Sequence, residues 1–171
     1  MHSFEVESVR EAGNDTIFEI DILPNRAHDC LAHYGVAREV AALCNLAMTR
    51  SPPTAALSNW QGSSRLFVRV EDFTLCPRYS AVVIENVAVG PSPEWLVERL
   101  RAIGERSINN VVDAMNYVMF DIGQPLHAFD IERLAVSEGA VSIGVRSARE
   151  GQRLMTLEGV ERAIPGGTLL I

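Results

Sequence analysis

Lysine is absent from this 171-residue chain, so all 15 basic residues are arginine. The absence excludes a lysine-containing phosphate-binding loop and a Schiff-base mechanism, because both need a lysine amine. Arginine instead supplies rigid guanidinium groups that suit phosphate and carboxylate. Coding bias explains the choice of arginine more simply than a functional cause does.

Cysteine is scarce, and a secretory leader and long apolar runs are missing. Cys30, Cys44 and Cys76 form no C-x-x-C pair, and no histidine lies at metal-ligand spacing from them. This pattern predicts buried, reduced thiols and no metal site. The N-terminus is acidic where a secretory peptide needs an apolar core. No apolar stretch approaches the roughly 20 residues that cross a bilayer, so we expect a cytoplasmic protein without membrane association.

Two catalytic sequence patterns are also missing. There is no G-x-S-x-G and no G-x-G-x-x-G, which removes the usual support for a nucleophilic hydrolase and for a Rossmann dehydrogenase. The net charge of −7 argues against binding nucleic acid over the whole surface but permits a local basic site.

The hydrophobic periodicity predicts an α+β fold with two small mixed modules, largely antiparallel sheets and packed helices. Alternation predicts strands over residues 16–22, 65–71, 79–87, 141–145, 154–157 and 168–171. Helical spacing predicts helices over residues 28–44, 93–103 and 108–121, and a short turn ends at Leu134. The expected capping residues are Asn25 or Asp29 and Asn45 for the first helix, Ser92 for the second and Ser107 for the third.

The middle of the chain indicates a boundary. Residues 49–64 lack periodicity and contain a proline pair among small polar residues, which is typical of a linker. We therefore predict one module over 1–50, a linker over 51–64 and a second module over 65–171. The last predicted strand reaches the C-terminus without a turn, so we expect the second module to be truncated.

One predicted helix carries a polar stripe. Asn109, Asp113 and Asn116 are spaced i, i+4, i+7 and so share one helix face. Such a stripe could hold the hydroxyl groups or the amine of a ligand. The pattern alone favours the alternative, in which these residues cap the helix and face solvent.

Three other positions are candidates with plainer alternatives. His127, on a proline-stiffened loop, could position a water or shuttle a proton, or it could simply bond to backbone. Arg26 could clamp a phosphate or pin a neighbouring module, but a turn in which it has a capping role is the simpler interpretation. His28 and His33 are expected at the surface.

Several stretches closely resemble the bacterial phenylalanyl-tRNA synthetase beta subunit. Residues 106–113 (RSINNVVD), 116–119 (NYVM) and 123–130 (GQPLHAFD) resemble the signature motif of this subunit. A second set of residues resembles the N-terminal module of this subunit, in the part that follows an inserted oligonucleotide-binding-like fold. These residues are 19–21, 24–26, 29–31 and 35–43. Residues 154–160 also fit, so the resemblance follows nearly the whole chain in order.

The resemblance implies a place in a larger enzyme. That enzyme joins phenylalanine to its tRNA with ATP and Mg²⁺ and assembles from two alpha and two beta subunits (α2β2), with synthesis in the alpha subunit. The beta module removes tyrosine wrongly attached to the tRNA. This fragment is expected to hold no cofactor itself. The physical need is plain, because an apolar pocket built for phenylalanine rejects an added hydroxyl by only about a hundredfold.

The resemblance also assigns site residues by motif position. His127 and Asn116 match residues that line the family's editing pocket. His127 is expected to orient the ester or the attacking water, and Asn116 to hold the aminoacyl group. Arg106, Asn109 and Met115 are expected to contact or support the substrate. Ester hydrolysis needs little beyond a positioned water and donors for the developing oxyanion.

The sequence departs from the family pattern in three ways. Met115 stands where threonine is common, and Asp121 stands where glutamate is usual. The glutamate that reads the tyrosine hydroxyl in the family lies further along than residue 171. We therefore expect an incomplete site and an inactive fragment. The alternatives are a non-catalytic fragment for assembly or tRNA positioning, and a free-standing deacylase.

Overall fold

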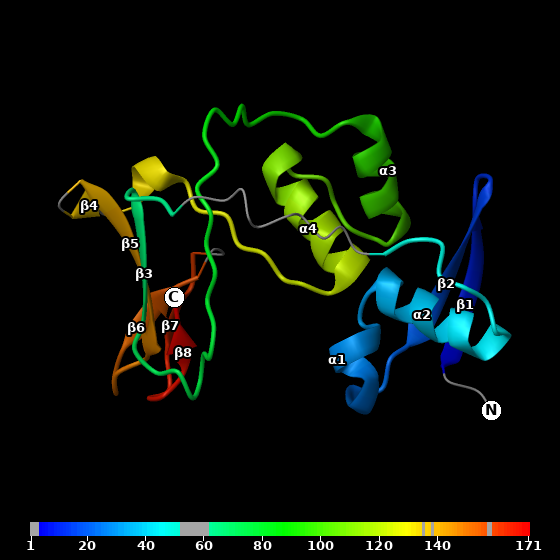
Figure 1. The fold of residues 1–171 in the computed structure, drawn as a ribbon, viewed down its shortest axis with the longest axis horizontal. Helices are drawn as coiled ribbons and strands as arrows, with labels where there is room; N and C mark the ends of the chain where they lie inside the picture. Colours follow the sequence, from blue (N-terminus) through cyan, green and yellow to red (C-terminus); the bar gives the residue numbers. More distant parts are fainter. Residues whose placement is uncertain (1–3, 52–61, 135, 138, 157–158) are drawn as a thin grey trace. The chain divides into compact units, whose positions relative to one another are not determined.

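The computed structural model describes residues 4–51, 62–134, 136–137, 139–156 and 159–171 (Figure 1). The chain forms two compact units that do not follow chain order. Unit 1 joins Met1–Leu57 to Ala88–Ala128, and unit 2 joins Ser58–Val87 to Phe129–Ile171. The predicted α+β class is confirmed by the mixture of helices and small, mostly antiparallel sheets. The predicted modules over 1–50 and 65–171 stay a prediction.

Unit 1 begins with a hairpin of β1 (Glu5–Ala12) and β2 (Asp15–Asp21), so the strand predicted at 16–22 is confirmed. β1 was not predicted, because its register shifts between Val6 and Ser8 and this irregularity breaks the alternation. Val9 lies opposite Phe18, and both are more than half exposed. Strand alternation normally places one face against a core, but at Phe18 this face is open to solvent.

The helix predicted at 28–44 is divided in two. A 3-10 turn, η1 (Pro24–Arg26), leads into α1 (Ala27–Cys30), and α2 (His33–Cys44) follows after a break. The break brings Gly35 against α1, where a Cβ would lie 1.7 Å from the backbone oxygen of Asp29. Asn45 ends α2 in the left-handed conformation, as predicted. The predicted caps at Asn25 and Asp29 are wrong, because neither helix begins with a side-chain cap.

Two further helices complete unit 1. α3 (Glu94–Ala102) and α4 (Asn110–Ile122) confirm the predicted helices, and α3 buries Leu96 and Leu100. Trp95 of α3 meets Tyr117 of α4 edge to face, with ring centroids 5.5 Å apart. The caps predicted at Ser92 and Ser107 are wrong: Pro93 and Asn109 occupy the capping positions.

Unit 2 is built on β5 (Ala140–Ser147), whose inward residues form its core. Val141, Ile143 and Val145 are buried, as their alternation predicts. β3 (Leu66–Val70) pairs with β5 in parallel, whereas β4 (Val136–Ser137) and β8 (Leu169–Leu170) pair with it antiparallel. β6 (Arg153–Met155) and β7 (Glu161–Ala163) form a separate hairpin, and η3 (Ile131–Arg133) is the predicted short turn.

The strand predicted at 79–87 is wrong. These residues adopt no regular structure, and Val82, Ile84 and Val87 are about half exposed or more. Alternation creates a strand only where a neighbouring strand accepts the backbone hydrogen bonds, and none does so within the described residues. Leu157, at the end of the predicted strand 154–157, and most of the predicted linker 51–64 lie outside the described residues.

The cysteine prediction holds at one position. Cys30 is buried, whereas Cys76 is half-buried and Cys44 is exposed, and the three are free thiols. Among the described helices, none has the length and apolar character that crossing a membrane requires.

Candidate functional site

A buried carboxylate fixes the start of α4. The side chain of Asp113 is fully buried, and its Oδ2 accepts hydrogen bonds from the hydroxyls of Ser92 at 2.5 Å and Ser107 at 2.6 Å. Its Oδ1 accepts the backbone N–H of Ile108 at 2.9 Å. Burial raises the pKa of Asp113, but these hydrogen bonds and one from the backbone of Asn109 outweigh it, so the net pKa lies below its ordinary value.

The polar stripe of α4 is mostly used for structure. The side chain of Asn109 accepts the N–H groups of Val111 at 3.1 Å and Val112 at 3.0 Å, which confirms the capping alternative there. Solvent exposure, the other half of that alternative, is wrong for Asp113. The stripe therefore leaves Asn116, half-buried in the middle of α4, as its candidate for ligand contact.

The side chain of Asn110, at the start of α4, binds the backbone of the segment where the chain re-enters unit 1 at Ala88. Its Oδ1 accepts the N–H of Gly90 at 3.1 Å, and its Nδ2 donates to the oxygen of Ala88 at 2.9 Å. Its own N–H donates to the oxygen of Gly90 at 2.9 Å. The sequence pattern gave no indication of this clamp, because an amide that pairs with backbone looks the same as one that faces a ligand.

The five predicted site residues all lie in unit 1, on α4 and on the segments directly before and after it. Arg106, exposed, and Asn109 precede or start the helix, whereas Met115 and Asn116 are half-buried in its middle. His127 is exposed on the loop that follows it. Arg106 lines a cavity of about 350 Å³ that none of the other four residues lines. The other residues around this cavity are Val97, Arg101, Gly104, Glu105 and Ser107.

The last turn of α4 is tied to the N-terminal part of unit 1. Arg50 donates through both terminal nitrogens to the two carboxylate oxygens of Asp121, at 2.9 and 2.5 Å. These hydrogen bonds hold the pKa of Asp121 below its ordinary value, against the opposing effect of burial. His33, expected at the surface, is exposed, and its Nδ1 lies 2.8 Å from the carbonyl oxygen of Phe120.

Arg26 is neutralised by two carboxylates. Its Nη2 lies 2.9 Å from Asp29 Oδ2 and 2.9 Å from Glu39 Oε2, and its guanidinium carbon lies 5.7 Å from the ring centroid of Phe4. The hydrogen bond from Arg26 lowers the pKa of Asp29 to about 2. These contacts favour a structural role at the turn over a phosphate clamp. The expected capping role is wrong, because Arg26 precedes α1 but its side chain makes no capping hydrogen bond.

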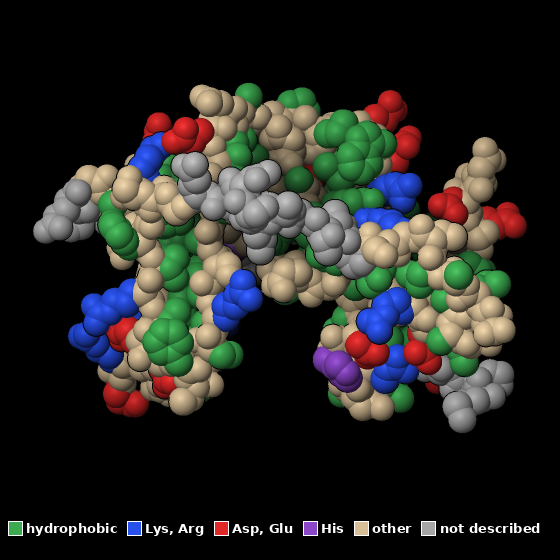
Figure 2. Space-filling view, in the orientation of Figure 1, with side chains coloured by type: hydrophobic (Ala, Val, Ile, Leu, Met, Phe, Trp, Pro, Cys, Tyr) green, Lys and Arg blue, Asp and Glu red, His purple; other side chains and the backbone are tan. Residues whose placement is uncertain are grey.

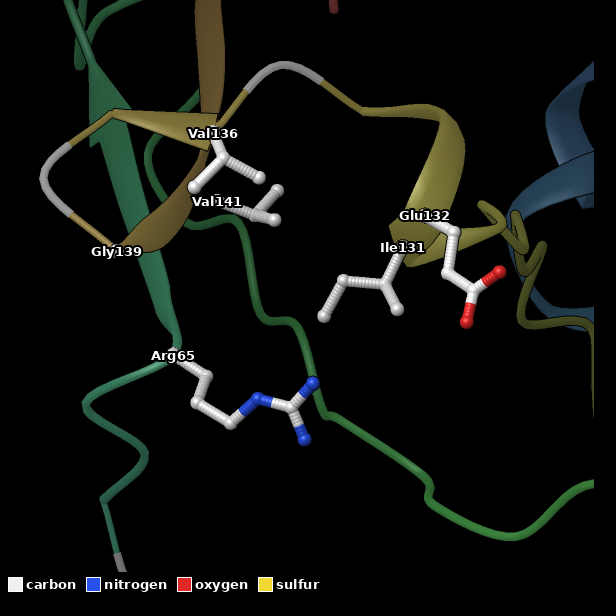
Figure 3. Close-up of a pocket in the computed structure, with 6 residues that line it drawn as sticks. All are labelled: Arg65, Ile131, Glu132, Val136, Gly139 and Val141. Atoms are coloured by element: carbon white, nitrogen blue, oxygen red, sulfur yellow. The ribbon is translucent and has the colours of Figure 1, made fainter.

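Unit 2 contains a separate cavity of about 180 Å³ (Figure 3). Figure 3 shows apolar side chains, the carboxylate of Glu132 and the guanidinium of Arg65 around it. The guanidinium of Arg65 forms an ion pair with Glu85. The cavity is lined by Arg65, Ile131, Glu132, Val136, Gly139 and Val141. None of these is a predicted site residue. The described residues include no cluster of three metal-binding side chains.

Comparisons with known proteins confirm the resemblance found in the motifs. The family described as the B3/4 domain matches residues 75–171, more than half of the chain. The phenylalanine–tRNA ligase beta subunit of Carboxydothermus hydrogenoformans is 47% identical over 98% of this chain and 20% of its own length. Those of Geobacter metallireducens and Gloeobacter violaceus are 50% and 48% identical over 92% of this chain and 19% of theirs. The chain thus spans about a fifth of the curated relatives it matches.

Proposed function

Because the chain belongs to the B3/4 domain family, we propose that it is part of the beta subunit of a phenylalanine–tRNA ligase. The observation that carries the proposal is the 47% identity to such a subunit over 98% of the chain. The alpha subunit, in an α2β2 assembly, and the tRNA for phenylalanine are its partners. ATP and Mg²⁺ serve the synthetic reaction of the holoenzyme, and this segment binds neither. The cytoplasm is its place of action.

Within that subunit, we propose that the segment contributes to hydrolysis of tyrosine from mischarged tRNA. An apolar phenylalanine pocket discriminates poorly against one extra hydroxyl, so a second, hydrolytic site improves fidelity. Support comes from the signature on residues 106–130 and from an amide on α4 that the helix cap does not use. That amide belongs to Asn116, and His127 lies on the loop directly after the same helix.

The chemistry asks for positioned donors rather than a strong nucleophile. The imidazole of His127 orients the attacking water or the ester, and the amide of Asn116 holds the aminoacyl group. Asn109 acts by capping α4, and the exposed guanidinium of Arg106 suits a phosphate of the tRNA. Met115 offers an apolar contact where a threonine would offer a hydroxyl.

The test uses the full-length beta subunit assembled with its alpha partner and a tRNA charged with tyrosine. We expect His127→Ala to slow hydrolysis about a hundredfold or more, in line with the loss of a positioned proton-transfer group. Charging with phenylalanine should stay at the wild-type rate. His28→Ala is the matched control, because that imidazole is 77% exposed and far from α4 in sequence. Hydrolysis by His127→Ala at the wild-type rate would remove His127 from the mechanism.

A second candidate function is non-catalytic assembly or tRNA positioning. Hydrophobic side chains lie open on the face shown in Figure 2, and the apolar residues Val9, Phe18 and Leu43 of unit 1 are each more than half exposed. Comparing tyrosyl-tRNA hydrolysis by this chain and by a version extended at the C-terminus separates the two functions. Hydrolysis by neither favours the assembly role.

A further inference from the structure

The C-terminal end of α4 is held by residues from the first 50 positions of the chain. The guanidinium of Arg50 bonds both carboxylate oxygens of Asp121, at 2.9 and 2.5 Å. His33, the first residue of α2, contacts the carbonyl oxygen of Phe120 through Nδ1 at 2.8 Å. The side chains of His33 and Arg50 therefore bind adjacent residues in the last turn of α4.

A third contact lies where the chain leaves the helix. Gly123 ends α4 with a φ of 81°, and its N–H donates to the oxygen of Met119 at 2.8 Å. A Cβ at Gly123 would lie 3.3 Å from the Cβ of Ala32, the residue before α2. The backbone at Gly123 is thus packed against the α1–α2 junction. His127 follows four residues later, on the loop that begins at this point.

The acid of the Arg50–Asp121 ion pair is mostly buried. The side chain of Asp121 is 15% exposed, and that of Arg50 is 55% exposed. Removing the guanidinium leaves a largely buried carboxylate without this partner, which costs much more than breaking an exposed pair. The pair of Arg153 and Glu161 provides the comparison, because its side chains are 55% and 52% exposed. The two parallel hydrogen bonds also fix the orientation of the carboxylate relative to the guanidinium, which a single hydrogen bond does not.

We infer that Arg50 and Asp121 are positioning residues that orient the loop carrying His127. The inference rests on the proposed function and adds to it a segment, ending at Arg50, to which the signature motifs assign no part in hydrolysis. Neither residue touches the substrate. Their effect is to keep the imidazole within reach of the reacting ester, where a displacement of about 1 Å costs up to about a hundredfold in rate.

The first test measures kinetics in the full-length subunit assembled with its alpha partner. We expect Arg50→Ala to lower kcat for hydrolysis of tyrosyl-tRNA by about ten- to a hundredfold. KM for the mischarged tRNA and the rate of phenylalanine charging should not change. Arg50→Lys keeps the positive charge but cannot form the two parallel hydrogen bonds, so its kcat should lie between those of Arg50→Ala and wild type. Arg153→Ala, matched in exposure, should behave as wild type.

The second test measures backbone amide exchange over residues 119–127, which requires no activity. Exchange should be faster in Arg50→Ala than in wild type or Arg153→Ala, because the last turn of α4 loses its anchor. Unchanged kcat, or equal losses of hydrolysis and charging, would overturn the inference. If the wild-type enzyme does not hydrolyse tyrosyl-tRNA, the proposed function fails, and unchanged exchange would then overturn the anchor separately.

Discussion

Replacing Ser92 with alanine should destabilise unit 1 through the carboxylate of Asp113. The hydroxyl of Ser92 donates to Oδ2 at 2.5 Å, and the carboxylate is fully buried, so water cannot take the place of the lost donor. A hydrogen bond to a buried charged group contributes about 1.5–3 kcal/mol. For a chain of this length the loss lowers Tm by about 3–12 °C. Ser107→Ala removes the other hydroxyl on the same oxygen and should cost a similar amount.

The assay compares thermal and urea unfolding of the single variants, the double variant and a matched control. Ser8→Ala is the control, because the Ser8 hydroxyl also donates to a carboxylate, that of Glu19 at 2.8 Å, but at an exposed site. We expect the control to change the free energy of unfolding by less than about 0.5 kcal/mol. Ser92 and Ser107 share one acceptor atom, so their effects should not add. A Ser92→Ala variant as stable as the control would refute the importance of this network.

The network also predicts how stability depends on pH. The pKa of Asp113 is lower in the folded chain than in the unfolded chain, where it is about 3.9. Its contribution to stability is therefore complete above about pH 4 and is lost as the pH falls through the folded value. Without both serines the folded pKa rises, so unfolding below about pH 4 should depend less steeply on pH than in wild type.

The remaining predictions concern α1 and its neighbour α2. Gly35→Ala should cost about 3 kcal/mol or more, measured by urea unfolding, because its Cβ would meet the Asp29 oxygen at 1.7 Å; near-wild-type stability would contradict this close approach. The carboxyl of Asp29 should titrate near pH 2 by NMR, and Arg26→Ala should raise its pKa toward about 3.9. If the pKa of Asp29 were the same in Arg26→Ala as in wild type, the ion pair would not be the cause of the low value.

Strong periodicity made the main elements predictable. Val141, Ile143 and Val145 alternate without interruption, and β5 forms as the core of unit 2. Leu96 and Leu100 are one helical turn apart, and α3 buries both. In each element a single apolar face decides the structure, so local sequence contains the information needed.

The predictions fail where the structure depends on residues that are distant in the sequence. β1 breaks its own alternation at an irregularity, and residues 79–87 alternate well but have no strand beside them within the described part of the chain. Ser92 and Ser107 look like helix caps from their neighbours in sequence. Both turn instead to Asp113, 21 and 6 residues away, because a buried carboxylate needs donors more than the helix ends do.

The candidate site was predictable only in part for the same reason. The pattern around Asn109 correctly included capping as an alternative, because the residue stands directly before a helical run. The clamp by Asn110 and the anchor between Arg50 and Asp121 join residues 20 and 71 positions apart. No local pattern indicates such pairs, so they emerge only from the folded chain.

The most direct test of the central claim is whether Asn116 and His127 act in one site. Hydrolysis of tyrosyl-tRNA by the assembled full-length enzyme should be measured for Asn116→Ala, His127→Ala and the double variant. If the two side chains serve one hydrolytic centre, the double variant should be little slower than the slower single variant. Losses in rate that simply multiply, or a wild-type rate in either single variant, would contradict a shared site.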